Sequence, residues 1–260
     1  MPLRPFASLS LLAALAAGPS ATADDPKPML PPKEKFRVFL LIGQSNMAGR
    51  GRPESVDKTP HPRVLVLDKA DAWVAAAEPL HFDKPAVAGV GPGFAFGRAA
   101  AEALPDATIG LVPCAVGGSS IDQWKKGGRL REEAVRRAKI ALRDGTLAGI
   151  LWHQGESDAL PERTAAYKEK ALALFAELRR ELDAPEVPVV VGTLGDFVRK
   201  GGGINEVLRA LPKDLPRSAC ADAKGLADKG DRLHFSAEAA RELGKRYFEE
   251  WLKLDKAAGR

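Results

Sequence analysis

The amino-acid sequence predicts an α/β protein, a three-layer α/β/α sandwich built around a mainly parallel sheet of five strands. Short apolar runs alternate along the chain with longer amphipathic stretches, and such alternation is typical of strands joined by crossover helices. Most of the short runs are continuously apolar rather than alternating, as expected for parallel strands that are buried on both faces.

Five segments carry these apolar runs, and the first, FRVFLLI, is the longest. The predicted strands are residues 36–42, 64–67, 108–112, 149–152 and 187–191. The connections between the parallel strands should be right-handed.

Amphipathic stretches between and after these strands predict the helices. They cover residues 93–104, 130–143, 163–182 and 236–252. In the last stretch, apolar residues recur at three- and four-residue steps, which places them on one helix face. These residues are Ala240, Leu243, Tyr247, Phe248 and Trp251. Residues 196–230, which contain three consecutive glycines, predict an irregular excursion before the final helix.

The first 23 residues predict a cleavable signal peptide. Arg4 supplies a positive charge, residues 6–17 are almost uninterruptedly apolar, and Ala21-Thr22-Ala23 provides the small-x-small pattern of a cleavage site. The apolar run is too short to span a bilayer core of about 30 Å. We therefore expect a secreted or periplasmic protein, with a flexible lead-in at residues 24–35 and one domain at residues 36–256.

Composition narrows the classes of partner. The formal charge of +5 comes from 39 basic and 34 acidic residues without a block of like charge, so nothing indicates a nucleic-acid partner. No later stretch predicts a transmembrane helix, so no membrane association is expected after cleavage. The four histidines lack the spacing of metal ligands, and no metal or other cofactor is expected. Whether Cys114 and Cys220 pair is left open, because sequence does not show their separation.

The first candidate catalytic residue is Ser45, in the block GQSNMAG that follows the first predicted strand. A serine just past the carboxyl end of a central parallel strand lies where open α/β sheets bind ligands. If a helix begins there, the Ser45 N–H helps to stabilise an oxyanion. The G-x-S-x-G elbow is absent, because Met47 occupies its second glycine position. Helix capping alone is the alternative role.

A candidate base and its orienting acid lie immediately before the last predicted helix. Asp231 and His234 are three residues apart in the block DRLHF, so a tight turn can place the carboxylate on the imidazole Nδ1 while Nε2 points outward. This is the acid and base half of a Ser-His-Asp triad. A surface histidine beside an unrelated acid is the alternative.

Two further strand ends carry chemistry-bearing residues. Gly117-Gly118 follows the third predicted strand and allows the backbone to approach a ligand. The block WHQGESD begins with the last residue of the fourth strand, where a cluster of polar residues is costly unless it lines a site. Because three strands deliver such residues at one edge of a sheet, the combination predicts an esterase site.

Four blocks together resemble, in this order, those of the SGNH hydrolases in the sialate O-acetylesterase and acetylxylan esterase branch (carbohydrate esterase family 6). The blocks are GQSNMAG, CAVGGSSIDQW, WHQGESD and DRLHF, and the similarity spans about residues 37–250. The resemblance implies a flavodoxin-like sandwich, an SGNH-type esterase domain, and hydrolysis of O-acetyl esters on carbohydrate without a metal.

The resemblance also implies roles for individual residues. Ser45 would be the nucleophile, His234 the general base, and Asp231 the acid that orients it. The oxyanion hole would consist of the backbone N–H groups of Ser45 and Gly118 and the side-chain amide of Gln154, where other SGNH hydrolases use asparagine. Glu156 would be either a supporting carboxylate or the alternative triad acid. Gln44, Asn46 and His153 are the candidate substrate contacts.

Two other functions remain open at this stage. An SGNH lipase or thioesterase would act on longer acyl esters, and a catalytically dead carbohydrate-binding module would keep the fold without the reaction. The sequence does not define the sugar, the regioselectivity or the oligomeric state.

Overall fold

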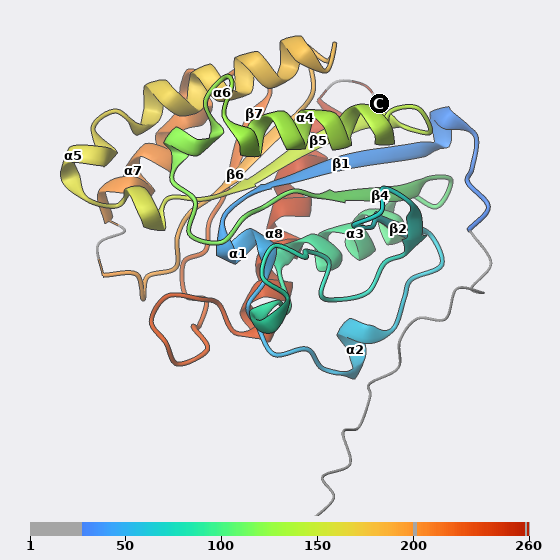
Figure 1. Cartoon of the computed structure of the whole chain (residues 1–260), viewed down its shortest axis with the longest axis horizontal. Helices are drawn as coiled ribbons and strands as arrows, with labels where there is room; N and C mark the ends of the chain where they lie inside the picture. Colours follow the sequence, from blue (N-terminus) through green and yellow to red (C-terminus); the bar gives the residue numbers. More distant parts are fainter. Residues whose placement is uncertain (1–27, 200–201, 258, 260) are drawn as a thin grey trace, which may run out of the picture.

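The computed structural model describes residues 28–199, 202–257 and 259, which form an α/β/α sandwich (Figure 1). The predicted signal peptide therefore lies outside the described residues, as does the beginning of the lead-in. Of the lead-in, residues 28–32 lack regular structure and Lys33–Lys35 form a 3₁₀ turn, η1.

The sheet has seven strands rather than the five expected, in the order β3-β2-β4-β1-β5-β6-β7. The strands are β1 (Phe36–Gly43), β2 (Val64–Leu67), β3 (Trp73–Ala75), β4 (Thr108–Pro113), β5 (Thr146–His153), β6 (Val189–Gly192) and β7 (Ser218–Ala221). Every pairing is parallel except that of β2 with β3. The two unpredicted strands are the short edge strands, and β7, with the sequence SACA, lacks the bulky residues that favour strands.

Helices cover both faces of the sheet. The longer ones are α3 (Pro92–Ala103), α4 (Arg129–Ala141), α6 (Tyr167–Glu181), α7 (Gly202–Ala210) and α8 (Ala237–Lys256). One-turn helices are α1 (Ser45–Ala48), α2 (Ser55–Lys58) and α5 (Pro161–Thr164). Further 3₁₀ turns are η2 (Pro85–Val87), η3 (Ile121–Trp124), η4 (Glu156–Asp158) and η5 (Leu211–Lys213). Among the described residues, no helix is both long enough and apolar enough for a membrane span.

The expected irregular excursion at residues 196–230 is wrong in part, because it contains α7, η5 and β7. Ile204, Leu208 and Leu211 recur at helical spacing and are fully buried. The adjoining glycines, which disfavour helix, obscured this apolar face in the sequence. The helix expected at residues 163–182 is divided into α5 and α6.

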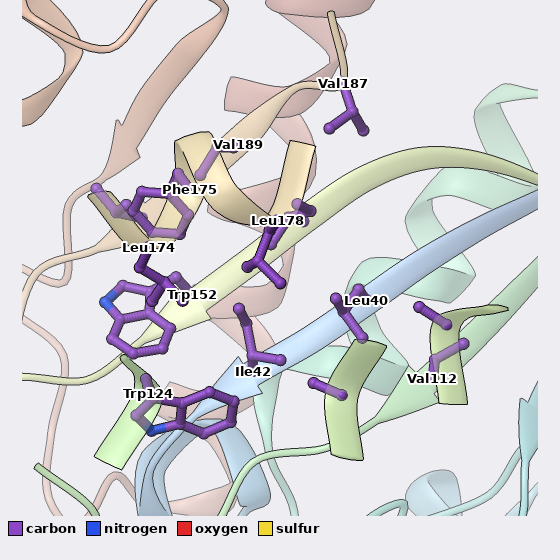
Figure 2. Close-up of a cluster of buried hydrophobic side chains, with 14 of the residues drawn as sticks. Leu40, Ile42, Val112, Trp124, Trp152, Leu174, Phe175, Leu178, Val187 and Val189 are labelled. Carbon is purple, nitrogen blue, oxygen red and sulfur yellow. The ribbon is translucent and has the colours of Figure 1, made fainter. Parts of the chain in front are cut away.

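Side chains of the central strand β1 alternate between two cores. Leu40 and Ile42 pack under α4 and α6, together with Trp124 and Trp152 (Figure 2). Phe39 and Leu41 pack on the opposite face, against α3 and α8. Because both faces of β1 are buried, its continuous apolar run follows directly from its place in the sheet.

The two cysteines are free. Cys114 follows β4 and Cys220 lies in β7, with β1, β5 and β6 between their strands. Burial raises the pKa of both thiols to about 12, which makes them poor nucleophiles at neutral pH.

Trp251 anchors α8 to the sheet. Its ring is fully buried, lies 5.1 Å from that of Phe39 between centroids, and packs edge-on against it. The indole Nε1–H also donates to the carbonyl of Ala148, at 2.8 Å. Trp251 therefore holds α8, the helix that follows the DRLHF block, against the sheet through both packing and a hydrogen bond.

Trp251→Ala is expected to lower the free energy of unfolding by about 3–5 kcal/mol, because it leaves a cavity against Phe39. Urea denaturation followed by circular dichroism measures this loss. Val74→Ala, at a partly exposed position of edge strand β3, is the control and should change stability by no more than about 0.5 kcal/mol. Equal losses for the two variants would contradict the anchoring role.

Candidate active site

The predicted site residues converge at the carboxyl edge of the sheet. Ser45 follows β1, Gly118 follows β4, and Gln154 follows β5, and these three strands are neighbours. His234 arrives from the segment before α8. Parallel pairing therefore brings together segments that are far apart in the chain.

Ser45, His234 and Asp231 form one hydrogen-bonded chain. The Oγ atom of Ser45 lies 3.1 Å from Nε2 of His234, and Nδ1 of the same ring lies 2.7 Å from Oδ2 of Asp231. When Nδ1–H donates to the carboxylate, the neutral ring presents Nε2 as an acceptor for the serine hydroxyl.

The Asp231 carboxylate also shapes the turn that carries His234. Its Oδ1 accepts the backbone N–H groups of Leu233 at 3.0 Å and of His234 at 2.8 Å. Partial burial opposes ionisation, but these bonds and the one from the His234 ring outweigh it and lower the pKa of Asp231 to about 2. The carboxylate is therefore ionised at neutral pH.

Glu156, the alternative triad acid, does not face His234 Nδ1. Its Oε1 accepts a hydrogen bond from Nδ2 of Asn46 at 2.5 Å. Burial raises the pKa of Glu156 to about 7. Of the two acids that the sequence left open, the structure places Asp231 against the imidazole and Glu156 behind Asn46.

The Gly117-Gly118 turn lies directly beside Ser45. A Cβ atom built on Gly117 would lie 3.5 Å from Cβ of Ser45. Gly118 has φ +80°, and a Cβ built there would meet only Nζ of Lys84, at 4.0 Å. The residue next to Gly118 therefore lies against Ser45, and the Gly118 position itself is open.

A buried ion pair holds this turn from behind. Arg50 Nη2 lies 2.8 Å from Oδ2 of Asp83, and both side chains are almost completely buried. The same Oδ2 accepts the N–H of Gly117 at 2.7 Å. Burial opposes the ionisation of Asp83, but these two hydrogen bonds outweigh it and lower the pKa of the carboxyl. Asp83 therefore couples a buried charge pair to the glycine turn.

The predicted oxyanion role of Gln154 does not fit its position. The side chain is fully buried, and Nε2 lies within hydrogen-bond distance of Asp158 Oδ2 at 2.6 Å, Ser119 O at 3.0 Å and Gln44 Oε1 at 3.0 Å. A primary amide has two N–H donors, so three internal acceptors leave none for an oxyanion. Gln154 instead ties the end of β5 to the segment that follows the glycine turn.

The three predicted substrate contacts are also corrected, because all are buried. Gln44 accepts through Oε1 from Gln154, and Asn46 bonds to Glu156. His153 is fully buried with Nδ1 3.1 Å from the Tyr247 hydroxyl, and burial lowers its pKa to about 3. All three side chains are at most 3% exposed, which leaves them almost no surface for contact with a substrate.

Sequence reasoning missed Asp83, Arg50 and the structural part played by Asp158. Asp158 lies in WHQGESD, and its Oδ2 accepts the N–H of Ile121 at 2.9 Å as well as that of Gln154. Arg50 directly follows GQSNMAG, and this adjacency was its only signal in the sequence. Asp83 had none. Among the described residues, no cluster of three or more potential metal ligands occurs.

Comparisons with known proteins agree with this architecture. Residues 35–253 match the family model described as "Carbohydrate esterase, sialic acid-specific acetylesterase". A probable carbohydrate esterase of Arabidopsis thaliana is 38% identical over 252 residues, which cover 87% of this chain and 95% of the relative.

Solved structures show the same fold. The crystal structure of an Arabidopsis thaliana protein superimposes with a TM-score of 0.76 at 35% identity, covering 86% of this chain and 99% of that one. NanS superimposes with a TM-score of 0.72 at 19% identity, covering 88% and 100% of the two chains. The chain belongs to the family of carbohydrate esterases described as sialic acid-specific acetylesterases, and it is a carbohydrate O-acetylesterase.

Proposed function

We propose that this protein hydrolyses O-acetyl esters on carbohydrate through an acetyl-serine intermediate on Ser45. The observation that carries the proposal is the continuous hydrogen-bonded chain from Ser45 through His234 to Asp231. Hydrolysis by a hydroxyl nucleophile needs a base within reach of its proton and a group that orients the base. This chain supplies both.

The reaction begins when Nε2 of His234 takes the Ser45 hydroxyl proton as Oγ attacks the acetyl carbonyl carbon. Asp231 stabilises the resulting imidazolium and fixes the ring orientation. The tetrahedral intermediate collapses when the sugar oxygen leaves with the proton from His234, so acetate remains esterified to Ser45. Water, deprotonated by His234, then attacks the acetyl carbonyl carbon, and the second tetrahedral intermediate releases acetate as His234 returns the proton to Ser45 Oγ.

Backbone N–H groups are the oxyanion donors in this proposal. They are those of Ser45 and Gly118, since Gly117, the neighbour of Gly118, lies against Ser45 and is held by Asp83. A donor that is fixed before the reaction stabilises developing charge without the cost of reorganisation. The third expected donor, Gln154, contributes by holding the Ser119 segment.

The acyl group and the sugar are tested together by acetate release from acetylated xylan, acetylated sialosides and nitrophenyl esters of increasing chain length, all in the presence of EDTA. An acetylesterase should lose activity sharply beyond two or three acyl carbons. Undiminished turnover of long-chain esters would favour a lipase or thioesterase. Dependence of acetate release on added zinc would contradict a purely serine-based reaction.

We also propose that the protein is exported, on the strength of the signal-peptide pattern in the first 23 residues. Cell fractionation with N-terminal sequencing of the mature chain tests this. A cytoplasmic protein that retains Met1 would contradict it.

Ser45→Ala is expected to abolish turnover of nitrophenyl acetate, because it removes the proposed nucleophile. The fold should stay intact, because the variant loses only the hydroxyl that bonds to His234. Initial rates and thermal denaturation measure the two properties. Wild-type protein quenched in acid during turnover should carry an acetyl group on the peptide that contains Ser45. Substantial kcat in the variant would show that Ser45 is not the nucleophile.

Asp231→Asn should reduce kcat by a factor that approaches ~10⁴, because the amide favours the wrong imidazole tautomer. Asp228→Asn is the matched control, since Asp228 Oδ2 accepts only backbone N–H groups of the same loop, those of Gly230 and Arg232. The control variant should retain most of the wild-type kcat. Similar losses in both variants would mean that loop order, not imidazole orientation, is the affected property.

Asp83→Asn is expected to lower both stability and kcat. Removing one partner of a buried ion pair lowers the free energy of unfolding by about 3–5 kcal/mol. Loss of the Asp83 contact should also displace Gly117 and with it the neighbouring Gly118 N–H, so kcat should fall roughly 10-fold or more. Glu250→Gln, which removes an exposed ion pair with Lys253, should cost no more than about 1 kcal/mol. Unchanged kcat in Asp83→Asn would remove the proposed coupling.

A further inference from the structure

Asn46 connects the segment of the nucleophile directly to the segment of the base. It is the residue after Ser45, and its side chain is almost fully buried. Nδ2 donates to the carbonyl of Leu233 at 3.0 Å, and Oδ1 accepts the N–H of Phe235 at 3.1 Å. The amide thus binds the backbone on both sides of His234.

Glu156 determines which way this amide faces. The second N–H of Asn46 donates to Oε1 of Glu156, so both amide hydrogens and the oxygen have partners. A flipped amide would place its oxygen against the carboxylate and against Leu233 O, and its N–H₂ against the N–H of Phe235. Acceptor would face acceptor twice and donor would face donor once, all away from water, so the flipped orientation is unfavourable.

We propose that Asn46, oriented by Glu156, is a positioning residue that sets the distance between Ser45 Oγ and His234 Nε2. The inference rests on the proposed function, because it assigns a role to groups that act through the serine and the histidine. The Asp231 contact orients the imidazole within its own turn. The Asn46 contacts place that turn relative to the nucleophile, and no other side chain bonds to the backbone on both sides of His234 among the described residues.

The chain offers a matched control for this role. Asn205 is also buried, and its amide likewise binds a backbone N–H and a backbone carbonyl, both of Leu194, at 2.7 and 3.0 Å. Asn205→Ala therefore removes the same kind of buried clamp without loosening a contact to Ser45 or His234. A comparable fall in Tm is expected for Asn46→Ala and Asn205→Ala.

The first test compares nitrophenyl acetate hydrolysis by these two variants. Asn46→Ala should lower kcat by roughly 100-fold with KM nearly unchanged, since a displacement of about 1 Å between reacting groups costs this much. Asn205→Ala should keep most of the wild-type kcat. Equal kcat values for the two variants would overturn the inference.

The second test asks whether the loss acts through the base. Exogenous imidazole should partly restore His234→Ala, and adding Asn46→Ala to that variant should lower the restored rate only a few-fold, because the free base no longer depends on where residue 234 is held. A further loss of about 100-fold in the restored rate would overturn the inference.

Glu156 is tested by a conservative and a disruptive change. Glu156→Gln keeps an oxygen that accepts from Asn46 and should lose only several-fold in kcat, whereas Glu156→Leu removes the acceptor and should lose distinctly more. The reverse order would show that Glu156 does not act by orienting Asn46. If Ser45→Ala remained active, the proposed function itself would fail; if it is inactive while Asn46→Ala behaves like Asn205→Ala, only this inference fails.

Discussion

The junction at Gly43, where β1 ends, joins the three strand ends of the site. Gly43 pairs with His153 across the β1–β5 register, and its carbonyl accepts the N–H of Val116 at 3.0 Å from the segment after β4. Its φ is +128°, and a Cβ atom there would lie 2.1 Å from the carbonyl oxygen of His153. Only glycine allows this approach. Because the backbones lie this close, the chain turns outward at Ser45 with the β4 and β5 loops already beside it.

Beneath that junction lies an interior that is unusually polar for the core of a sheet. The side chains of Asp83 with Arg50, of Gln154 with Asp158, and the Glu156 carboxylate are all buried near the strand ends. Burying such groups is unfavourable unless each is hydrogen-bonded. Here several of their hydrogen bonds go to backbone groups of the neighbouring loops, those of Gly49, Gly117, Ser119 and Ile121. The energetic cost is thus offset by contacts that restrict loop movement, and a fixed geometry is what a serine nucleophile and backbone oxyanion donors require.

The parts of the fold and site that were predictable are those in which local sequence decides the structure. The run FRVFLLI predicts a strand because both faces of β1 are buried, and Asp231 reaches His234 because the two lie three positions apart in one turn. The Asp83–Gly117 contact joins residues 34 apart, and no periodicity records it. Gln154 was misassigned although one of its partners is local, because the sequence does not show which way its amide points. Its amide has suitable N–H donors, but Oδ2 of Asp158, four residues later, accepts a hydrogen bond from Nε2 inside the protein.

These buried side chains also explain why the motifs identify the chemistry but not the sugar. Gln44, Asn46, His153 and Gln154 belong to the two most distinctive blocks, yet all are at most 3% exposed and bond to other parts of the protein. Their spacing therefore encodes the support of the serine, the histidine and the glycine turn, which any acetyl ester requires. A sugar is recognised by groups that reach solvent, and none of these four side chains does so. The hydrogen bonds between Ser45 and His234 and of the buried side chains that support them are therefore independent of which carbohydrate carries the acetyl group.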